Sequence, residues 1–499
     1  MVSKIKTETI KIANMPSSDG TFWRGLGGHF SSLTQIISEF VDNSISGFIE
    51  SPIPHAHISV NLMRLKNGDV KIQVIDNAQG IKDLDSAFEL GSVKGKSSSL
   101  NEHGFGMKHA LASANPENDN WVITTRTTED VKKNQYKVIS APYKFDDFEA
   151  DLYEGSDIDS KTGTKIEFTA SKDLFRTIVS GLQGNYQTLS SISKILAEDL
   201  GYIYATFIKD EVASILIEFH EEGQEKEFLK VTAVEPLVES TIAPGNNRED
   251  VDLGGGEVVI DYKFSKLSEN KQFKKHYIKT MSTSGVEIRI NGRLLASNIF
   301  KEIWGIEKHN SYNYLLVQIN IISQDPGRLP RTTTSKTGIR QDDDKLSALY
   351  KWIQRKLPTP KPDSKLSDDK IDLLAQLRDA KKPHISDTDI INLEQYAYNT
   401  LVDQNKIRID LYLVQNNEVI VYEGKKDKTT PQDVYQLMMY WDGLVYDGIN
   451  PKLGILIASE HPNSVAEIVS LVNSRKDDNN NNYNFIMKTW NDEGVNYPN

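Results

Sequence analysis

The 499-residue sequence contains no cysteine. This absence excludes disulfides, cysteine-ligated zinc, iron–sulfur clusters and thiol catalysis. The sequence also lacks a run of about 18 uninterrupted apolar residues, which a membrane-spanning helix needs. Its first residues, MVSKIKTETIKIANM, lack the apolar core of a signal peptide. We therefore expect a cytoplasmic protein that has no membrane as a partner.

Positive charge is not in excess either. The sequence has 58 Lys and Arg against 70 Asp and Glu, a net charge of −12. This excludes a uniformly basic nucleic-acid coat but leaves room for a local basic groove. The hydrophobic fraction of 38% and charged fraction of 26% permit a sizeable core. At roughly 150 residues per domain, the length corresponds to about three domains.

Proline marks the clearest domain boundary. The run LPTPKPDSK, residues 357–365, cannot lie inside a helix or a central strand. A softer boundary falls near residues 171–200, where a helical stretch leads into new strand patterns such as EVASILIEF. We expect domains at 1–175, 176–356 and 366–499, with 357–365 as a linker.

One amphipathic helix carries a pair of polar side chains. Residues 31–49 repeat apolar residues at the three- and four-residue spacing of a buried stripe, with Ser31 or Ser32 as N-cap. Glu39 and Asn43 are four apart, so they project together from a flank of that stripe. A carboxylate and an amide placed in this way can act as a base and a metal ligand. Taken alone, the pair also fits a solvated helix edge.

Three further segments place a glycine near the end of a strand, the start of a helix or the start of a strand. The alternating strand DVKIQVID, residues 69–76, ends in Asp76 just before a turn that contains Gly80. A Gly/Ser/Lys-rich segment, residues 91–109, enters the helix MKHALASA through closely spaced glycines, whose backbone amides suit a polyphosphate. Gly163-Thr164 opens another strand. Each feature alone also fits an ordinary turn or connector.

The order and spacing of EFVDNS, VIDNAQGI, HGFGMKHA and GTKIEF resemble the GHKL ATPase superfamily, which includes gyrase-type topoisomerases, MutL, heat-shock chaperone ATPases and MORC ATPases. The resemblance implies a Bergerat-type α/β sandwich that binds ATP and Mg²⁺ and closes as a homodimer. By it, Glu39 activates water, Asn43 holds Mg²⁺, and Asp76, assisted by Thr164, accepts the adenine amino group. The remaining cofactor-binding residues would be Gly80 beside the base and Lys94, Gly104, Gly106 and Lys108 around the phosphates. Ala78 departs from the family, which commonly has glycine there.

The middle of the chain predicts a β-hairpin and a basic loop. Residues 284–296 give two strands around Asn291-Gly292, a favoured hairpin turn. The later loop SQDPGRLPRTTTSKTGIR carries four basic residues that would ordinarily face solvent. In the GHKL family a transducer domain sends a lysine to the terminal phosphate, and TTTSKTGI resembles that loop. Lys336 is therefore the candidate, although a neighbouring basic residue in that role stays open.

A second β-hairpin near the C-terminus brings acids together. If IRIDLYLV (residues 407–414) and VIVYEGK (residues 419–425) pair across a turn at Asn416-Asn417, Asp410 lies opposite Glu423, with Lys425 on the same face. A one-residue slip in the register would put them on opposite faces. Two carboxylates can hold Mg²⁺, and a lysine beside them can orient or deprotonate water. An ordinary cross-strand salt bridge is the alternative.

The flanking pattern extends this motif. Thr430-Pro431-Gln432-Asp433 predicts a helix start, and the helix, which we expect to stop near Gly443, carries Gln436 and Tyr440 four apart. A strand, a helix and a strand follow, and a helix, IINLEQYAYNTLV, is expected ahead of the hairpin.

This order resembles the PD-(D/E)XK restriction-endonuclease-like superfamily over about residues 385–490. The resemblance implies that Asp410 and Glu423 bind Mg²⁺, or Mn²⁺ in its place, and that Lys425 assists the attacking water. Gln436 and Tyr440 match the Gln-x-x-x-Tyr helix of the RecB-like branch and would position the DNA backbone. Glu394 on the leading helix is either an additional ligand or a solvated residue.

Together these features predict an α/β and α+β protein that acts as an ATP-regulated, metal-dependent nuclease on nucleic acid, most simply DNA. Bacterial MORC-like ATPases with such nuclease domains resemble components of restriction or antiphage systems, which implies further partner proteins. Two alternatives stay open: an ATP-gated DNA clamp that does not cut, and a chaperone-like ATPase. RNA in place of DNA also stays open as the substrate, and so does restraint of cleavage by ATP in place of activation.

Overall fold

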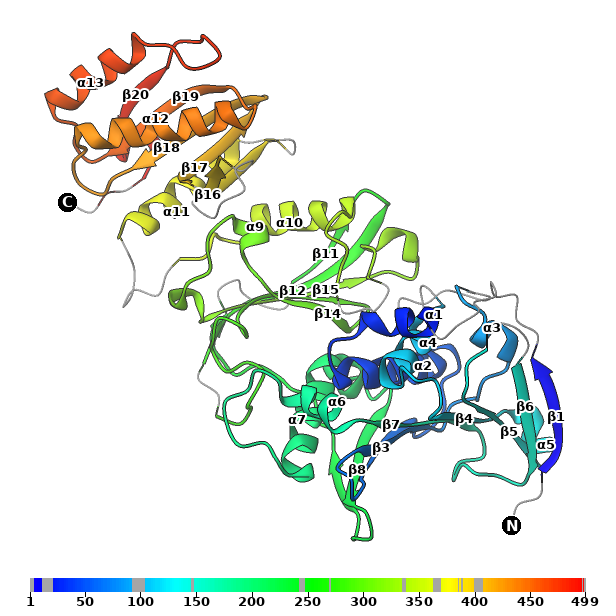
Figure 1. Cartoon of the computed structure of the whole chain (residues 1–499). Coiled ribbons are helices and arrows are strands. Elements are labelled where there is room, and N and C mark those ends of the chain that lie inside the picture. The colour runs from blue at the N-terminus through cyan, green and yellow to red at the C-terminus, as the bar shows by residue number, and fades with distance from the viewer. Residues whose placement is uncertain are drawn as a thin grey trace.

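The computed structural model describes residues 4–10, 21–91, 104–144, 148–241, 247–268, 271–333, 338–361, 369–384, 386, 389–398, 407–495 and 497. The described strands form three sheets, of nine, six and five strands. Figure 1 shows three sheet-containing modules in succession, which we name the first, middle and C-terminal modules. The mixed α/β class agrees with the sequence prediction. Lys94 and Lys336 lie outside the described residues.

The first module is built on the nine-stranded sheet. Helices α2 (Leu33–Glu50) and α4 (Gly106–Ala114) pack against its strands β3 and β7, and α7 (Leu189–Ile203) packs against β8. The sheet order is β1 (Lys4–Ile10), β6 (Phe148–Glu154), β5 (Gln135–Ser140), β4 (Trp121–Arg126), β7 (Gly163–Ala170), β3 (Val70–Asp76), β2 (His57–Arg64), β8 (Ser214–Glu221) and β9 (Glu227–Lys230). Shorter helices are α1 (Thr21–Leu26), α3 (Leu84–Phe88), α5 (Thr128–Lys132), α6 (Lys172–Arg176) and α8 (Ala205–Lys209).

Helix α2 confirms the amphipathic pattern of the sequence. The Ser32 hydroxyl caps it by accepting a hydrogen bond from the amide of Gln35. The apolar stripe is buried in the core of the first module, with exposed fractions of 1% or less for Leu33, Ile36, Ile37, Phe40, Val41 and Ile45. This burial fixes the rotation of the helix and therefore the direction in which Glu39 and Asn43 project.

The first sheet extends beyond the predicted domain boundary at residue 175. The segment EVASILIEF, which we expected in the next domain, forms β8 and pairs in parallel with β2. Its alternating residues Ile215, Ile217 and Phe219 enter the core of the first module. The first sheet therefore continues through β8 to its edge strand β9, which ends at Lys230.

The middle module is built on the six-stranded sheet. Its strands run in the order β10 (Val238–Thr241), β12 (Glu257–Leu267), β15 (Leu315–Ile322), β13 (Gly285–Ile290) and β14 (Arg293–Ile299), and β11 (Asn247–Asp252) pairs with β12. Helices α9 (Lys301–Trp304) and α10 (Asp344–Lys356) pack against each other. The predicted turn between β13 and β14 is confirmed, since Asn291 and Gly292 have φ angles of 47° and 89°.

The C-terminal module carries the five-stranded sheet. Its order is β16 (Ile390–Ala397), β17 (Ile407–Gln415), β18 (Glu418–Gly424), β19 (Pro451–Ala458) and β20 (Phe485–Thr489). Helix α11 (Asp369–Lys381) precedes the sheet, and α12 (Pro431–Tyr446) and α13 (Asn463–Asn473) pack against its strands. Among the described helices, none is long and apolar enough to cross a membrane.

The helix expected ahead of the C-terminal hairpin is wrong. Its first part forms strand β16, which pairs antiparallel with β17, so Glu394 lies on a strand and not on a helix. The physical reason is the two-residue period of Ile391 and Leu393, whose side chains are buried against the middle and C-terminal modules. Sheet pairing with residues that follow in sequence overrode the local helical pattern.

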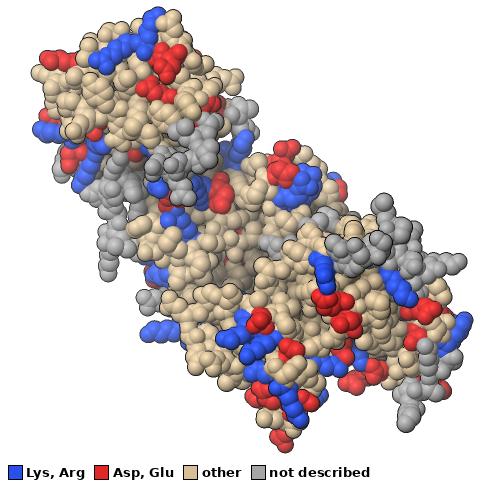
Figure 2. Space-filling model, viewed as in Figure 1, with Lys and Arg blue, Asp and Glu red and all other residues tan. Residues whose placement is uncertain are grey.

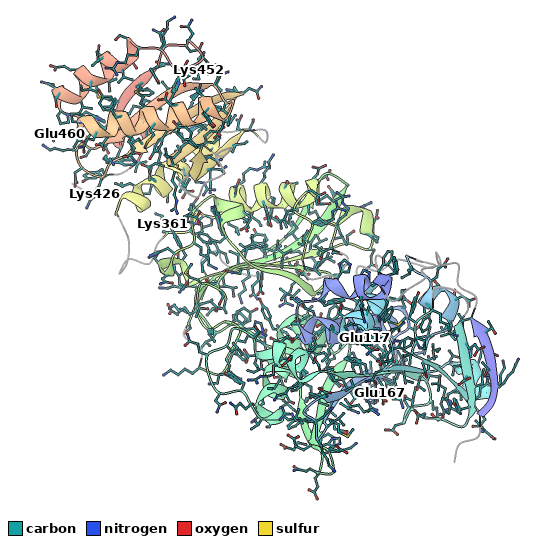
Figure 3. All side chains as sticks on the ribbon, viewed as in Figure 1. Glu117, Glu167, Lys361, Lys426, Lys452 and Glu460 are labelled. Atoms are coloured by element: carbon teal, nitrogen blue, oxygen red, sulfur yellow. The ribbon has the colours of Figure 1, made fainter. Side chains whose placement is uncertain are left out.

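The predicted linker is packed at its start. Leu357 and Thr359 are each 2% exposed. One apolar core continues from Trp304 and Ile353 of the middle module to Leu377 of α11. Figure 3 shows Lys361 at this junction between the two modules. The two modules therefore share buried surface and are not joined by a solvated spacer alone.

Candidate functional sites

Asp76 ends strand β3 and is held by three hydrogen bonds. Its Oδ1 accepts from the amides of Ala78 at 2.9 Å and Thr164 at 3.2 Å, and its Oδ2 accepts from the Ser44 hydroxyl at 2.8 Å. Burial raises the pKa of Asp76 above its ordinary value, and the three hydrogen bonds offset only part of this rise. A carboxylate offers about four acceptor positions, and these hydrogen bonds occupy three of them. The structure thus brings Asp76 and Thr164 together.

Two glycines let the backbone close around Asp76. A Cβ on Gly163, whose φ is 151°, would lie 2.0 Å from the carbonyl oxygen of Asp76. A Cβ on Gly80, whose φ is 72°, would lie 2.5 Å from the carbonyl oxygen of Arg126. Both positions therefore require glycine. Gly163 was missed as a site residue, although the Gly-Thr pair at the start of its strand marked it.

Ala78 is accommodated in this arrangement. Its side chain is 8% exposed and faces helix α2, where a Cβ on Gly47 would meet it at 3.4 Å, an ordinary contact. The methyl group of Ala78, at the position where the family commonly has glycine, therefore faces helix α2.

Glu39 of α2 lies against the start of α4. Its side chain is 2% exposed, and a Cβ on Gly106 would lie only 1.6 Å from its Oε1. The first residue of α4 must therefore be glycine if the carboxylate is to stay where it is. The amides of a helix N-terminus suit an anion in general, and here the Glu39 carboxylate lies directly beside such a helix end. Asn43, one turn further along α2, is half-buried.

Lys108, which we expected to contact phosphates, has a buried ammonium group that donates to backbone carbonyl oxygens. Its ammonium donates to the carbonyl oxygens of Ala87 at 2.9 Å and Glu89 at 3.0 Å, and the residue is 2% exposed. Burial lowers its pKa to about 8, against the opposing charges of Glu39 and Glu89. Lys108 thus ties α4 to the C-terminal end of α3. Gly104, with φ of 64°, stands two residues before α4.

The C-terminal hairpin has the predicted register. Leu411 pairs with Tyr422 and Tyr412 with Val421, and Asn416 and Asn417 have φ angles of 52° and 64°, as a two-residue hairpin turn requires. Beyond the last ladder pair, the Gly424 amide donates to Asp410 Oδ2 at 2.8 Å. Asp410 therefore lies across from the Glu423-Gly424-Lys425 end of β18.

Glu423 is the centre of a chain of polar contacts. It is fully buried. Its Oε1 lies 2.8 Å from the Lys425 Nζ, and its Oε2 accepts from the Tyr440 hydroxyl at 2.7 Å. The Gln436 amide in turn donates to the Tyr440 hydroxyl at 2.8 Å. Burial, with the nearby charges of Asp410 and Glu423, raises the pKa of Tyr440 far above its ordinary value.

Asp433 is a residue of this cluster that sequence reasoning assigned only to helix capping. The predicted cap is present: Asp433 Oδ2 accepts from the amide and hydroxyl of Thr430, at 2.7 Å and 3.0 Å. Its other oxygen lies 3.1 Å from the Lys425 Nζ. Lys425 is thus held between Glu423 and Asp433. The Trp490 indole also fixes its backbone by donating to the Lys425 carbonyl at 3.0 Å.

The donor set at this second site suits a hydrated hard cation. Within the described residues, no group of three or more His, Asp and Glu side chains could hold a metal ion. The hairpin register brings together two carboxylates, those of Asp410 and Glu423. Mg²⁺ commonly keeps several waters and uses one or two carboxylates. Two carboxylates match that ligand number, and the oxygens of Glu423 already contact Lys425 and Tyr440. The side chain of Glu394 lies outside the described residues.

The described surface shows no single basic groove on the face in Figure 2, where Lys and Arg are interspersed with Asp and Glu. This agrees with the net charge of −12. Binding of a polyanion would therefore depend on individual basic residues at the binding site and not on the electrostatic field of the whole protein.

No protein-family model and no curated protein matches this chain. Solved structures give distant likenesses. The N-terminal domain of a DNA repair protein has 15% identity and a TM-score of 0.40, over 67% of this chain and 95% of that one. The topoisomerase IV ATP-binding domain of Francisella tularensis, in complex with a small-molecule inhibitor, has 13% identity and a TM-score of 0.33, over 70% and 94%. The B-subunit of DNA gyrase from Myxococcus xanthus has 8% identity and a TM-score of 0.34, over 64% and 87%.

Proposed function

We propose that this chain is an ATP-regulated, metal-dependent nuclease that cuts nucleic acid, most simply DNA. The first module would be a GHKL-type ATPase of the Bergerat fold, the middle module a transducer, and the C-terminal module a PD-(D/E)XK nuclease. The observation that carries the proposal is the contact chain from Lys425 through Glu423 and Tyr440 to Gln436, with Asp410 across the hairpin. Five residues chosen from the sequence for nuclease chemistry belong to one cluster.

In the nucleotide site, Asp76 would accept the adenine amino group through its remaining acceptor position. Thr164 supports it by donating its own amide. Glu39 would take a proton from the attacking water, and the N-terminus of α4, beside Gly106, would bind the phosphates. Mg²⁺ would neutralise phosphate charge, with Asn43 as its ligand. Gly104 and Lys108 would keep the segment before α4 in place, and Lys94 would add charge to it.

The middle module would report the presence of the terminal phosphate through Lys336, which supplies a positive charge to it when the modules close. Closure would join two copies of the chain as a homodimer.

In the nuclease site, Asp410 and Glu423 would hold Mg²⁺ or Mn²⁺, which supplies Lewis-acid polarisation of the scissile phosphate. Lys425 would orient the attacking water. Gln436 and Tyr440 would fix the phosphate backbone and keep Glu423 in its rotamer. A cytoplasmic setting in restriction or antiphage defence, with partner proteins, fits a nuclease whose cutting must be controlled.

Plasmid nicking tests the proposal. The full chain is incubated with plasmid and Mg²⁺ or Mn²⁺, alone, with ATP and with a non-hydrolysable analogue. Cleavage that depends on the metal and changes with nucleotide is the expected result. Binding without nicking under every combination would favour a DNA clamp. ATP hydrolysis without salt-sensitive DNA binding would favour a chaperone-like ATPase, because phosphate contacts make affinity fall with salt.

A further inference from the structure

Two buried arginines mark the two ends of one short piece of chain, β14 followed by α9. We propose that this piece, residues 293–304, is a strut that couples the nucleotide helix α2 to the nuclease strand β18, with Arg293 and Arg378 as its positioning residues at either end. The inference rests on the proposed function and identifies how nucleotide regulates the second site.

The first end of the strut is anchored in α2. Arg293 forms a bidentate pair with Asp42: its Nε lies 2.9 Å from Oδ1 and its Nη2 3.1 Å from Oδ2. Asp42 is fully buried and Arg293 is 7% exposed. Asp42 stands directly before Asn43 and three residues after Glu39, on the same helix. A displacement of this part of α2 would therefore move the guanidinium with it, because a bidentate pair fixes both distance and orientation.

A tyrosine reinforces this anchor. The Tyr204 hydroxyl lies 2.7 Å from the Ser38 carbonyl oxygen and 2.8 Å from Asp42 Oδ1, and the Arg293 guanidinium stacks over its ring at 5.4 Å. The hairpin tip next to Arg293 is also tightly packed, since a Cβ on Gly292 would meet Thr206 at 2.9 Å. The start of β14 thus has little freedom to move independently of the first module.

The other end of the strut is anchored in α11. The carbonyl oxygen of Trp304, the last residue of α9, accepts from Arg378 Nη1 at 2.7 Å. Arg378 is completely buried, and its Nε and Nη2 find no acceptor among the described residues. Trp304 is therefore the one described acceptor for a buried cation. Gly305 follows with φ of 64°, and a Cβ there would lie 3.0 Å from the Leu393 carbonyl oxygen of β16.

Helix α11 in turn touches the nuclease strand between its two functional side chains. A Cβ on Gly424 would lie 3.1 Å from Leu374 of α11 and 3.2 Å from Trp490. Gly424 separates Glu423 from Lys425 and donates its amide to Asp410. A shift of α11 relative to the sheet would therefore alter the spacing of the proposed metal ligands. Close-packed interiors transmit such shifts because they have few voids to absorb them.

The first and middle modules also touch elsewhere, which provides a matched control. Arg289 on β13 is 7% exposed, like Arg293, and donates to the carbonyl oxygens of Tyr202 at 2.9 Å and Ile203 at 3.1 Å. Its hydrogen bonds go to the end of α7 and, at 3.4 Å, to the Gly292 carbonyl oxygen at the hairpin tip, and it does not lie on the 293–304 segment. The inference predicts that coupling depends on Arg293 and Arg378 and not on Arg289.

The test uses full-length Arg378→Met, the charge-free pair Asp42→Asn with Arg293→Met, and Arg289→Met. Methionine approximates the length of arginine, and apolar replacement of buried charges is often tolerated. Two quantities are measured for each: the ratio of cleavage rates with and without a non-hydrolysable ATP analogue, and hydrogen exchange of the β18 peptide with and without that analogue. Thermal unfolding checks that each variant is folded.

In the wild type we expect the analogue to change both quantities; coupling between sites commonly amounts to about 5- to 150-fold. Arg378→Met should bring the ratio close to 1 and remove the exchange change, while ATP hydrolysis and basal cleavage persist. The Asp42/Arg293 pair variant should also lose the exchange change, and Arg289→Met should retain it. Nucleotide effects that persist in Arg378→Met would overturn the strut, as would analogue binding without any effect at β18 in the wild type. Failure of the wild type to bind nucleotide would instead overturn the proposed function, and the strut with it.

Discussion

Gly106→Ala provides the sharpest test of the nucleotide site. An added Cβ would lie 1.6 Å from Oε1 of Glu39. Carbon and oxygen atoms in contact stand about 3.5 Å apart, so the carboxylate would have to move by about 2 Å. The helix backbone is fixed by packing, whereas the end of the Glu39 side chain can rotate. The substitution should therefore displace the proposed base and leave the fold intact.

The size of the effect follows from that displacement. A misplacement of about 1 Å can cost about 100-fold in rate, and a general base contributes about 10²–10⁴-fold. Gly106→Ala should thus lower ATP hydrolysis at least about 100-fold. Adenine binding should persist because the hydrogen bonds of Asp76 involve neither Gly106 nor Glu39. Glu39→Ala should abolish turnover while it keeps ATP binding, and the double variant should be no slower than either single variant.

The assay is steady-state phosphate release together with nucleotide binding followed by calorimetry. Gly25→Ala is the matched control, since a Cβ at this position of α1 would meet nothing within 4 Å. Wild-type turnover in Gly106→Ala would refute the reasoning, and so would unchanged hydrolysis in Glu39→Ala. Loss of nucleotide binding in a folded Gly106→Ala variant would show instead that the phosphate cradle, rather than the base, had been damaged.

Three further predictions concern single contacts. Lys425→Met should stop plasmid cleavage and leave ATP hydrolysis unchanged. Lys452→Met, at a side chain that is 63% exposed in the same module, should leave both activities unchanged. Persistent cleavage in Lys425→Met would remove the nuclease assignment. Tyr440→Phe deletes the donor to buried Glu423, so urea unfolding should give a stability loss of about 1–3 kcal/mol, and an unchanged midpoint would contradict the hydrogen bond. Burial lowers the pKa of Lys108 from 10.5 to about 8, so the unfolded chain binds more protons between these values and stability should rise with pH across that window. Lys108→Met should lack this share of the rise, and an identical pH slope in both proteins would count against the burial of the charge.

Local patterns predicted the elements that carry both sites. The apolar stripe of α2, with its N-cap at Ser32, and the β17–β18 register could be read from the sequence because each depends on residues that are neighbours along the chain. The two-residue turn at Asn416 and Asn417 sets the register between β17 and β18, the two strands that it joins. Correct register is what brings Asp410 to the Glu423 end of β18.

Partners that are distant in the chain could not be predicted in this way. Asp42 and Arg293 are 251 residues apart, and nothing in the local pattern of either one indicates the other. The helix predicted for residues 390–402 was wrong for the same reason, since pairing with β17 makes residues 390–397 a strand. The boundary expected at residue 175 fell inside the first sheet because β8 pairs with β2, a strand far upstream in the chain. Tertiary pairing decided each of these cases.

The protonation of Lys425 narrows its part in cleavage. Burial alone would lower its pKa, but the hydrogen bonds and charges of Glu423 and Asp433 outweigh burial and raise it. Lys425 is then a stable ammonium at neutral pH, which can orient water or stabilise phosphate charge but cannot accept a proton. Asp433→Asn removes one of the two carboxylates that contact Lys425 and should lower the pKa of Lys425. NMR titration of the lysine can follow this change. A cleavage rate that climbs in step with deprotonation of Lys425 would contradict this role, because it would make the neutral amine the active form.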